Sequence, residues 1–239
     1  MTEELKQAEP IIKYVDHIGV FENFVRDDFC DTLVEAFEYW YKLKYTKEMS
    51  WTSDERTYDM TATSEGQDQF ASNGGHLKRK DKQLYLEVSD PTLALQVSEA
   101  VGVAFEKYVE EYRGVIDGAD PLSSWTVKLQ KTEPGGGYHK WHCENGNFLY
   151  RDRVLTWMIY LNDVPYECGG GTDFLHQKFS LQPKKGTVVV WPACYTHMHR
   201  GAFLSGDANK YIATGWFLRE PGEIPTNHLS GRETSDQLG

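Results

Sequence analysis

The second half of the chain is a series of short runs rich in β-branched and aromatic residues, and this pattern limits the fold more than any other feature. The runs cover residues 125–130, 154–161, 187–191 and 211–218. Glycine and proline separate them, as is typical of short strands joined by turns. Because no helical pattern alternates with these strands, a parallel sheet of the Rossmann type is not expected. The spacing predicts a β-sandwich or barrel.

Two amphipathic helices are predicted before the β-rich half. The first begins at Asp27 or Asp28, and its apolar stripe consists of Phe29, Leu33, Phe37, Trp40 and Tyr41. The second has Asp90 as its N-cap, Pro91 in its first turn and Gly114 at its end. Since both stripes need the β half to cover them, we expect a single domain over residues 1–239. It comprises a helical support and loop region (1–124), a β core (125–218) and a C-terminal tail (219–239).

Composition and charge exclude several classes of partner. No apolar stretch approaches the roughly 20 residues that a membrane span needs. The net charge of −11 repels phosphate backbones, so no nucleic-acid partner is expected, and a neutral or basic protein target is favoured. The start of the chain is acidic and polar, unlike a secretory leader, and the four scattered cysteines form no disulfide framework. These features predict a cytoplasmic protein without a membrane partner.

A polar segment, residues 52–80, precedes a short predicted strand at 83–88. A segment of this length without periodicity is either a functional loop, such as a lid over the substrate, or a disordered connector. Its last residues, 76–80, are basic, and we expect them to lie in a solvated loop rather than in a phosphate site.

His142 and Glu144 form the most informative motif. They lie two residues apart, so in a strand both side chains would project from the same face. One histidine and one carboxylate are two of the three ligands in the facial triad that binds non-haem iron(II) and leaves positions open. His197 or His199 could supply the third ligand. Taken alone, the motif favours a structural histidine at a strand end beside an exposed glutamate.

Lys210 opens the last predicted strand. In a regular strand it shares one face with Ile212, Thr214 and Trp216. A lysine that points into a barrel is costly unless it meets an anion. The opposite alternation, with Lys210 in solvent, is also open, because both faces of this strand carry an aromatic residue.

Taken in order, these motifs resemble the iron(II)/2-oxoglutarate-dependent oxygenases, and most of all the prolyl 4-hydroxylase branch. The resemblance rests on His142-x-Glu144, the distal His-Arg-Gly, and Lys210 before Thr-x-Trp. Further pieces match in order between residues 125 and 218, namely Pro134-Gly135, Tyr160-Leu161-Asn162, the Gly-Gly-x-Thr-x-Phe motif that ends at Phe174, Pro183-Lys-Lys-Gly186 and Trp191-Pro192.

The resemblance implies a mainly β fold, a double-stranded β-helix (jelly roll) packed by the N-terminal α-helices, with residues 125–218 as its catalytic core. It implies that His142, Glu144 and His199 are the catalytic, metal-binding residues, since the Arg-Gly that follows favours His199 over His197. It implies that Lys210 pairs with the far carboxylate of 2-oxoglutarate. The residues expected to line the co-substrate pocket are Tyr160, Thr172, Thr214 and Trp216.

The cofactors that the resemblance implies are Fe(II), 2-oxoglutarate and O2, with ascorbate as a further candidate. The implied reaction splits 2-oxoglutarate into succinate and carbon dioxide and hydroxylates an unactivated C–H bond. Arg153 corresponds by position to an arginine that contacts the substrate in prolyl hydroxylases. Its odd spacing from Tyr160 would place it on the other face of a regular strand, so we expect it at the barrel rim.

The chain departs from the family pattern at two positions. Glu144 stands where the family usually has Asp, and the extra methylene lengthens the reach by about 1.5 Å. Thr132 stands where a tyrosine commonly contacts the co-substrate. The carboxylate of Glu144 also argues against halogenation, since related halogenases have Ala or Gly at that position.

The leading hypothesis is a hydroxylase that acts on a protein or peptide residue, with proline as the expected target. One alternative keeps the chemistry but takes a free amino acid or another small molecule. Another is a jelly-roll metal-binding or sensor module without turnover. A zinc site built from His139, His142, Cys143 and Cys168 fits no usual spacing, and His139 has the opposite strand parity to His142.

Overall fold

The computed structural model describes residues 9–52, 77–117 and 121–220. The helices of these residues are α1 (Asp27–Lys42), α2 (Leu86–Ser89) and α3 (Pro91–Glu111). The strands are β1 (Ile11–Val15), β2 (Ile18–Glu22), β3 (Lys47–Thr52), β4 (Leu77–Tyr85), β5 (Leu122–Thr132), β6 (Gly137–Tyr138), β7 (Arg153–Tyr160), β8 (Thr172–Phe174), β9 (Phe179–Leu181), β10 (Val188–Pro192), β11 (His199–Gly201) and β12 (Lys210–Arg219).

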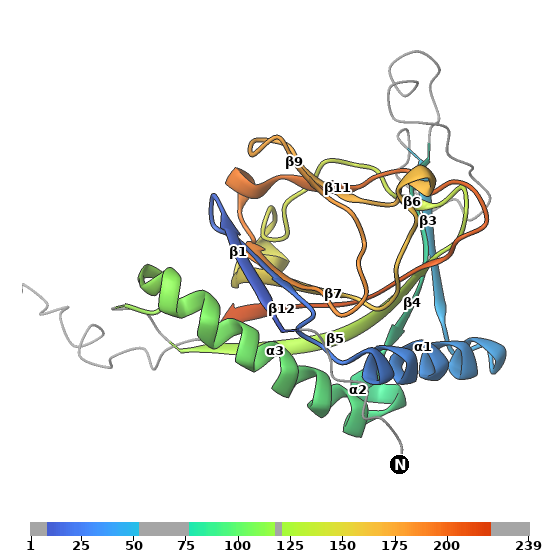
Figure 1. Ribbon diagram of the computed structural model, residues 1–239, viewed down its shortest axis with the longest axis horizontal. Coiled ribbons are helices and arrows are strands. Elements are labelled where there is room, and N and C mark those ends of the chain that lie inside the picture. The colour runs from blue at the N-terminus through green and yellow to red at the C-terminus, as the bar shows by residue number, and fades with distance from the viewer. Residues whose placement is uncertain (1–8, 53–76, 118–120, 221–239) are drawn as a thin grey trace, which may run out of the picture.

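Two antiparallel sheets face each other across the interior. The major sheet has the strand order β1-β2-β10-β7-β12-β5-β4-β3, with β6 paired to β4, and the minor sheet has the order β11-β8-β9. Figure 1 shows the minor sheet across the interior from the central strands β5, β7 and β12, with α1 and α3 on the outer side of those strands. The predicted jelly roll with flanking helices is confirmed.

The outer face of the major sheet is apolar because the helices cover it. Leu33 and Phe37 of α1 and Val97 and Val101 of α3 belong to one buried cluster. The sheet contributes Val127, Leu129, Leu155, Trp157, Ile159, Val188, Val190, Ala213 and Phe217 to the same cluster. Burial of this apolar surface holds the helices against the sheet, as the stripes predict.

The ends of the helices differ in part from the prediction. Asp90 caps α3 as expected, since its Oδ1 accepts a hydrogen bond from the backbone N–H of Leu93 at 3.1 Å. The helix ends at Glu111, however, and Gly114 lies in the short 3-10 turn that follows. Arg26 is the N-cap residue of α1, so Asp27 and Asp28 lie in the first turn of the helix. Their negative charges interact favourably with the positive end of the helix dipole.

The N-terminal region is not only helical support and loops. It supplies β1 and β2 at one end of the major sheet and β3 and β4 at the other. β4 begins at Leu77, so the strand predicted at 83–88 starts earlier and gives way to α2 at Leu86. Residues 77–80 of the basic run therefore lie in a strand and not in a solvated loop. Residues 53–76, which include most of the predicted lid or connector, lie outside the described residues.

The inner face of the same sheet is polar. Arg79, Asp81 and Gln83 of β4 and Lys128 and Gln130 of β5 line a cavity on this face. The other face of β4 carries Lys80 and Lys82, and of this strand only Leu84 joins the apolar cluster. Charged residues on both faces explain why β4 lacks the apolar signal of a typical buried strand.

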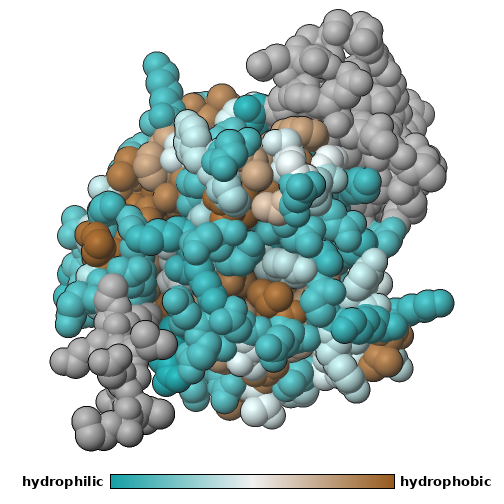
Figure 2. All heavy atoms as spheres, turned by 45° about the vertical axis from the view of Figure 1, so that its right-hand side comes forward, coloured by the Kyte–Doolittle hydropathy of each residue, from teal (hydrophilic) through white to brown (hydrophobic). Residues whose placement is uncertain are grey.

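The outer surface is mostly hydrophilic. Figure 2 shows one face on which hydrophilic residues cover most of the described area, with hydrophobic residues in small, separate groups. This distribution is ordinary for a protein surface and offers no broad apolar patch on that face. No helix among the described residues is long and apolar enough to cross a membrane.

Candidate active site

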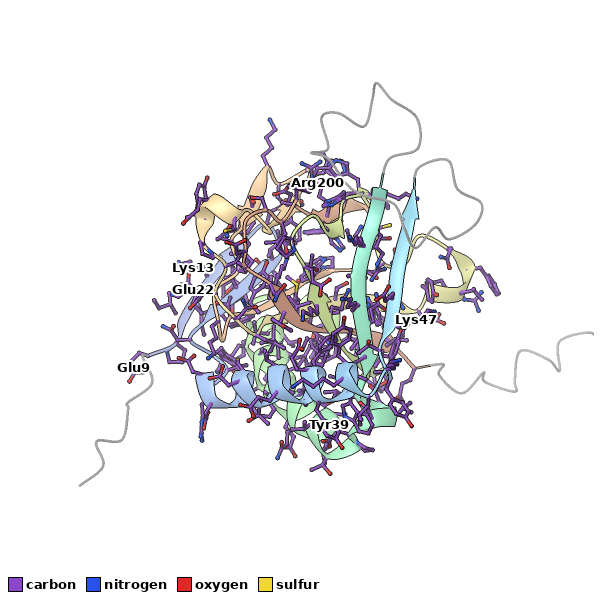
Figure 3. All side chains as sticks on the ribbon, turned by 90° about the vertical axis from the view of Figure 1, so that its right-hand side faces the viewer. Glu9, Lys13, Glu22, Tyr39, Lys47 and Arg200 are labelled. Carbon is purple, nitrogen blue, oxygen red and sulfur yellow. The ribbon has the colours of Figure 1, made fainter. Side chains whose placement is uncertain are left out.

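A cavity of about 650 Å³ opens between the two sheets. Strands β4, β5, β7 and β12 of the major sheet form one wall, and residues of the minor sheet and of the segment after β6 form the other. Lys47 on β3 and Arg200 on the minor sheet mark two borders of this cavity (Figure 3). Arg200 is neutralised by Asp173, with its Nε 2.9 Å from Oδ2.

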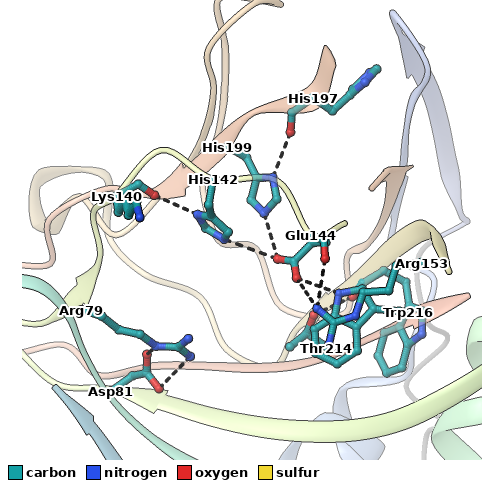
Figure 4. A network of polar contacts seen from close by, with 11 residues as sticks. Arg79, Asp81, Lys140, His142, Glu144, Arg153, His197, His199, Thr214 and Trp216 are labelled. Atoms are coloured by element: carbon teal, nitrogen blue, oxygen red, sulfur yellow. Dashed lines mark hydrogen bonds and ion pairs between the residues drawn. The ribbon is translucent and has the colours of Figure 1, made fainter. Parts of the chain in front are cut away.

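Three of the predicted ligands meet at one point of the cavity. The Nε2 atoms of His142 and His199 each lie 3.4 Å from Oε1 of Glu144 (Figure 4). The three donor atoms lie within 4.8 Å of one another, a group that could hold a metal ion. Two imidazoles and one carboxylate on one side of an ion are the ligand set of a facial triad.

Backbone hydrogen bonds, and not strand alternation, bring these side chains together. His142 and His199 form an isolated bridge in which each backbone N–H donates to the other carbonyl, at 3.1 and 2.9 Å. The N–H of Glu144 donates to the carbonyl of Ala193 at 2.8 Å. The prediction assumed that residues 142–144 form a regular strand, but the structure shows an isolated bridge at His142 instead.

Both histidines are oriented by backbone carbonyls. Nδ1 of His142 lies 2.8 Å from the carbonyl of Lys140, and Nδ1 of His199 lies 3.0 Å from the carbonyl of His197 (Figure 4). A carbonyl can only accept, so each Nδ1 carries the proton and each Nε2 presents a lone pair to the cavity. Burial lowers the pKa of His142, which favours the neutral imidazole that a metal requires.

The orientation of Glu144 is fixed by hydrogen bonds to Oε2, the carboxylate oxygen that faces away from the histidines. Its Oε2 accepts hydrogen bonds from Nε1 of Trp216 at 2.9 Å and from Nη1 of Arg153 at 3.0 Å. Burial acts to raise the pKa of this carboxyl, but polar contacts that favour its charged form outweigh burial and hold the pKa well below its usual range. Glu144 is therefore ionised, with Oε1 left for the cluster.

The remaining histidines of the motif lie elsewhere. Nε2 of His197 lies 2.8 Å from the carbonyl of Asp16, and its Nδ1 lies 2.9 Å from Oγ1 of Thr196, so the ring packs toward the β1–β2 turn. His139 is buried with Nδ1 3.0 Å from the carbonyl of Gly201, and it does not line the cavity. Within the described residues the structure therefore groups His199, and not His197 or His139, with Glu144.

Lys210 lies at the far end of the inner face of β12. Its side chain points inward and is 8% exposed, and Nζ donates to the carbonyl of Gly170 at 2.6 Å. Gly169 and Gly170 have φ values of 70° and 69°, which glycine adopts at little cost, and this turn aims the carbonyl at the lysine. Burial lowers the pKa of Lys210 to about 8. Of the two alternations open for β12, the one with Lys210 facing the interior is correct, since Ile212 also lines the cavity.

The residues expected around the co-substrate divide into two groups. Thr172, Thr214 and Trp216 line the cavity. Tyr160 does not, because its ring fills the core between the sheets and its hydroxyl donates to Oγ1 of Thr172 at 2.7 Å. The predicted position of Tyr160 on the pocket wall is therefore corrected to one behind Thr172, where it fixes the threonine hydroxyl.

Arg153 reaches the cavity through an irregularity in β7. Leu218 of β12 pairs with Arg153 whereas Phe217 pairs with Leu155, so Val154 is an extra residue in the strand. Val154 and Leu155 both pack toward the helices, and the parity of Arg153 is reversed. Its guanidinium lies 3.5 Å from the ring centroid of Trp216 and lines the cavity, although regular alternation places it on the other face.

Sequence reasoning missed the cations on β4 and β5. Arg79 forms a buried ion pair with Asp81, with Nε 2.6 Å from Oδ2 (Figure 4). Lys128 is 7% exposed, and burial, reinforced by the charge of Arg79, lowers its pKa to about 8. The period-two spacing of Lys128, Gln130 and Thr132 opposite the β12 residues was the available signal, because directly paired residues share a face.

The sequence also carries a family signature over this site. Residues 127–218 match the family model of the 2OG-Fe(II) oxygenase superfamily. This segment is a 2OG-Fe(II) oxygenase domain. The protein is accordingly a 2-oxoglutarate-dependent dioxygenase whose cofactors are Fe(II), 2-oxoglutarate and O2. The family match favours an enzyme over the alternative of a metal-binding module without turnover. A role for ascorbate stays a prediction.

Solved structures share the fold of this oxygenase. The viral collagen prolyl hydroxylase of Paramecium Bursaria Chlorella virus-1 is 16% identical with a TM-score of 0.58, over 86% of this chain and 97% of that one. A prolyl hydroxylase from Trichoplax adhaerens, solved with a hypoxia inducible factor peptide, is 14% identical with a TM-score of 0.60, over 85% and 84% of the two chains.

The fold also occurs in an enzyme with a different activity. The carbocyclase SnoK from nogalamycin biosynthesis is 14% identical with a TM-score of 0.57, over 93% of this chain and 89% of its own. No curated protein matches the sequence. At these identities the likeness establishes the shared fold, and the substrate has to be argued from the cavity.

Proposed function

We propose that this oxygenase hydroxylates a prolyl residue of a peptide, with His142, Glu144 and His199 as the iron ligands and Lys210 as the partner of the far carboxylate of 2-oxoglutarate. The observation that carries the proposal is the placement of a two-histidine, one-carboxylate cluster and a buried lysine in one cavity. A metal and a dicarboxylate need these two groups together.

The residues of the chain prepare the site before any ligand arrives. The Nδ1 hydrogen bonds hold both imidazoles with their lone pairs toward Glu144, and Arg153 and Trp216 hold its carboxylate in one orientation. Lys210 supplies a desolvated positive charge that a carboxylate can neutralise. With iron, 2-oxoglutarate and O2 bound, the chemistry available is decarboxylation to succinate coupled to hydroxylation of a C–H bond.

The choice of proline rests on the solved structures and on Arg153. Two of the similar structures are described as prolyl hydroxylases, and one of them holds a peptide. Arg153 stacks on Trp216 in the wall of the cavity next to Glu144, where a substrate residue would have to lie to be oxidised. A guanidinium plane there can support the ring and the backbone carbonyls of a peptide.

The first test is binding without turnover. Under anaerobic conditions iron(II) with 2-oxoglutarate should raise the melting temperature of the wild-type protein, because both ligands bind only the folded state. Lys210→Ala should retain the shift caused by iron and lose the part caused by 2-oxoglutarate. Lys107→Ala, at an exposed position of α3, is the matched control. If neither ligand shifts wild-type melting, the metal and co-substrate assignment is wrong.

The second test identifies the substrate class. Succinate release should increase when a proline-containing peptide is added, and the peptide should gain the mass of one oxygen atom. The same peptide with alanine in place of proline is the control. Succinate release without oxidation of any prolyl peptide would leave the oxygenase intact and overturn the choice of proline.

A further inference from the structure

Lys128 is a buried cation that the chemistry described above does not use. It lies in the middle of β5 with 7% exposure, and its side chain lines the cavity. Within the part of the chain that the structure describes, Nζ makes no hydrogen bond and no ion pair. Nζ lies over the ring of Trp216, whose centroid is 5.1 Å away. An aromatic face alone compensates only a part of the cost of burying a charge.

The neighbouring cations already have partners. Arg79 is paired with Asp81, whose Oδ1 also accepts a hydrogen bond from Gln83 at 2.8 Å. Arg153 is paired with Glu144, with Nη1 3.0 Å from Oε2. Away from the exposed border of the cavity, Lys128 is therefore the described cation whose charge has no acceptor.

Lys128 serves a different part of the cavity from Lys210. It pairs across the sheet with Thr214, and Lys210 pairs with Thr132. The two lysines are thus four positions apart along neighbouring strands, which is roughly 13 Å at the rise of an extended strand. Trp216 links Lys128 to the metal cluster, since its ring faces the lysine and its Nε1 donates to Oε2 of Glu144.

With a divalent metal and a dicarboxylate bound, the charges of the metal, Glu144, Lys210 and the co-substrate sum to zero, so Arg153 and Lys128 each add a positive charge. A divalent metal offsets more than the single charge of Glu144, and a dicarboxylate co-substrate meets Lys210 and the metal. Neither carries an acceptor for Lys128, four positions away from Lys210. A methionine of similar length would fill the space without the desolvation cost, so the charge indicates a ligand.

We propose that Lys128 binds a carboxylate of the substrate, next to the carbon that is oxidised. This inference rests on the proposed function and narrows its substrate class to one with an acidic group beside the target residue. That group is either the free α-carboxylate of a terminal residue or an adjacent acidic side chain. The ammonium donates to the carboxylate, and the paired Arg79 and Arg153 restrict the place where the anion fits.

The test uses two pairs of probes, each differing in one charge. N-acetyl-Gly-Pro is compared with its C-terminal amide, and N-acetyl-Gly-Pro-Asp-amide with N-acetyl-Gly-Pro-Asn-amide. Calorimetry with iron(II) and 2-oxoglutarate under anaerobic conditions measures their dissociation constants without turnover. We expect wild type to prefer the acidic member of at least one pair by about 10- to 100-fold, as for hydrogen bonds to buried charges. The pair that shows the preference identifies the source of the carboxylate.

Lys128→Met should abolish this preference, and Lys107→Met should keep it. Lys128→Met should also melt at a higher temperature than wild type, which a lysine with a structural role would not do. The proposal is overturned if wild type binds neither acidic probe, if it shows no preference, or if Lys128→Met retains one. It is overturned as well if Lys128→Met weakens 2-oxoglutarate instead.

Failure of this inference can be told apart from failure of the proposed function. Wild type that binds 2-oxoglutarate and releases succinate, yet ignores the charge of the probes, is an oxygenase without this subsite. Wild type that shows no melting shift with iron and 2-oxoglutarate lacks the function on which the subsite depends.

Discussion

The two ends of the cavity each hold one buried lysine, and the lysines differ in what they touch. Lys210 donates to the carbonyl of Gly170 at 2.6 Å, so it has an acceptor even without a ligand. Among the described residues, Lys128 contacts the face of Trp216 and has no hydrogen-bond acceptor. Burial lowers the pKa of each to about 8. The difference teaches that the lysine at one end has an acceptor in the protein before a ligand binds, whereas under the proposed subsite the charge at the other end is met only when a ligand binds.

The largest effect is expected from a substitution in the cluster of His142, Glu144 and His199, which lies between the two lysines. His199→Ala should reduce 2-oxoglutarate turnover to background and remove the iron-dependent rise in melting temperature, because one of the three proposed ligands is lost. His197→Ala, two residues away, should keep both, since its ring contacts Asp16 and Thr196. Succinate release and anaerobic melting measure the two effects. The opposite ranking would move the distal ligand to His197.

The next effect separates the two lysines directly. Lys210→Met should weaken 2-oxoglutarate by about 100-fold, the usual scale for truncating one partner of a buried charge pair. Lys128→Met should change the same dissociation constant by less than about threefold. Anaerobic calorimetry with 2-oxoglutarate measures both. Equal losses in the two variants would mean that both lysines belong to the co-substrate pocket, and the division of the cavity would fail.

The pH dependence of co-substrate binding tests the Lys210 end alone. Only the protonated lysine pairs with a carboxylate, and burial lowers the pKa of the free site to about 8. Affinity for 2-oxoglutarate should be constant below pH 8 and should fall toward tenfold per pH unit above it. Titrations of wild type and Lys210→Met between pH 7 and about 9.5 measure the difference. A wild-type affinity that stays flat over that range contradicts a buried ammonium as the partner.

The smallest effect is on stability, and it again ranks the two lysines. A folded pKa of about 8 lies below the usual lysine value, so each charge opposes folding at neutral pH. Lys128→Met should raise the free energy of unfolding by about 1–3 kcal/mol. Lys210→Met should gain less, because it also loses the hydrogen bond to Gly170. Urea unfolding measures both.

The sign of the pH effect on that gain is fixed. Between pH 8 and about 10 the unfolded lysine keeps its proton while the folded lysine loses it, so wild-type stability rises with pH relative to the variant. The gain from Lys128→Met should therefore be complete below pH 8 and should shrink above it. A gain that grows with pH would mean that the lysine stabilises the fold.

The sequence predicts the Lys210 end well because its information is local. The Gly-Gly turn, the inward lysine and the alternation of β12 all lie within short segments, and the motif order brings in the family. The approach of His142 and Glu144 to His199 was predicted as well, although through a strand that the structure replaces with a bridge to β11. The predicted grouping of the side chains is nevertheless correct, because the bridge brings His142 and Glu144 to the same side as His199.

The Lys128 end is not local, and this is why pattern reasoning missed it. Arg79 and Asp81 come from a segment that looks like a charged loop until it pairs with β5. The position of Tyr160 was missed for a similar reason. The residue lies on the predicted inner face of β7, but its ring packs in the core between the sheets and does not line the cavity. Which inner-face residue meets the cavity and which meets the core depends on the opposite sheet, and a strand pattern does not encode it.

The extra residue at Val154 has a consequence for comparing relatives. An alignment that keeps β7 free of gaps pairs Arg153 with a residue that faces the helices in any relative lacking the bulge. The functional counterpart in such a relative then stands one place nearer to the position of Thr156. Searches for the cavity-facing arginine in distant oxygenases should therefore allow a single-residue insertion at this point, because an alignment without it compares Arg153 with a residue on the opposite face of the strand.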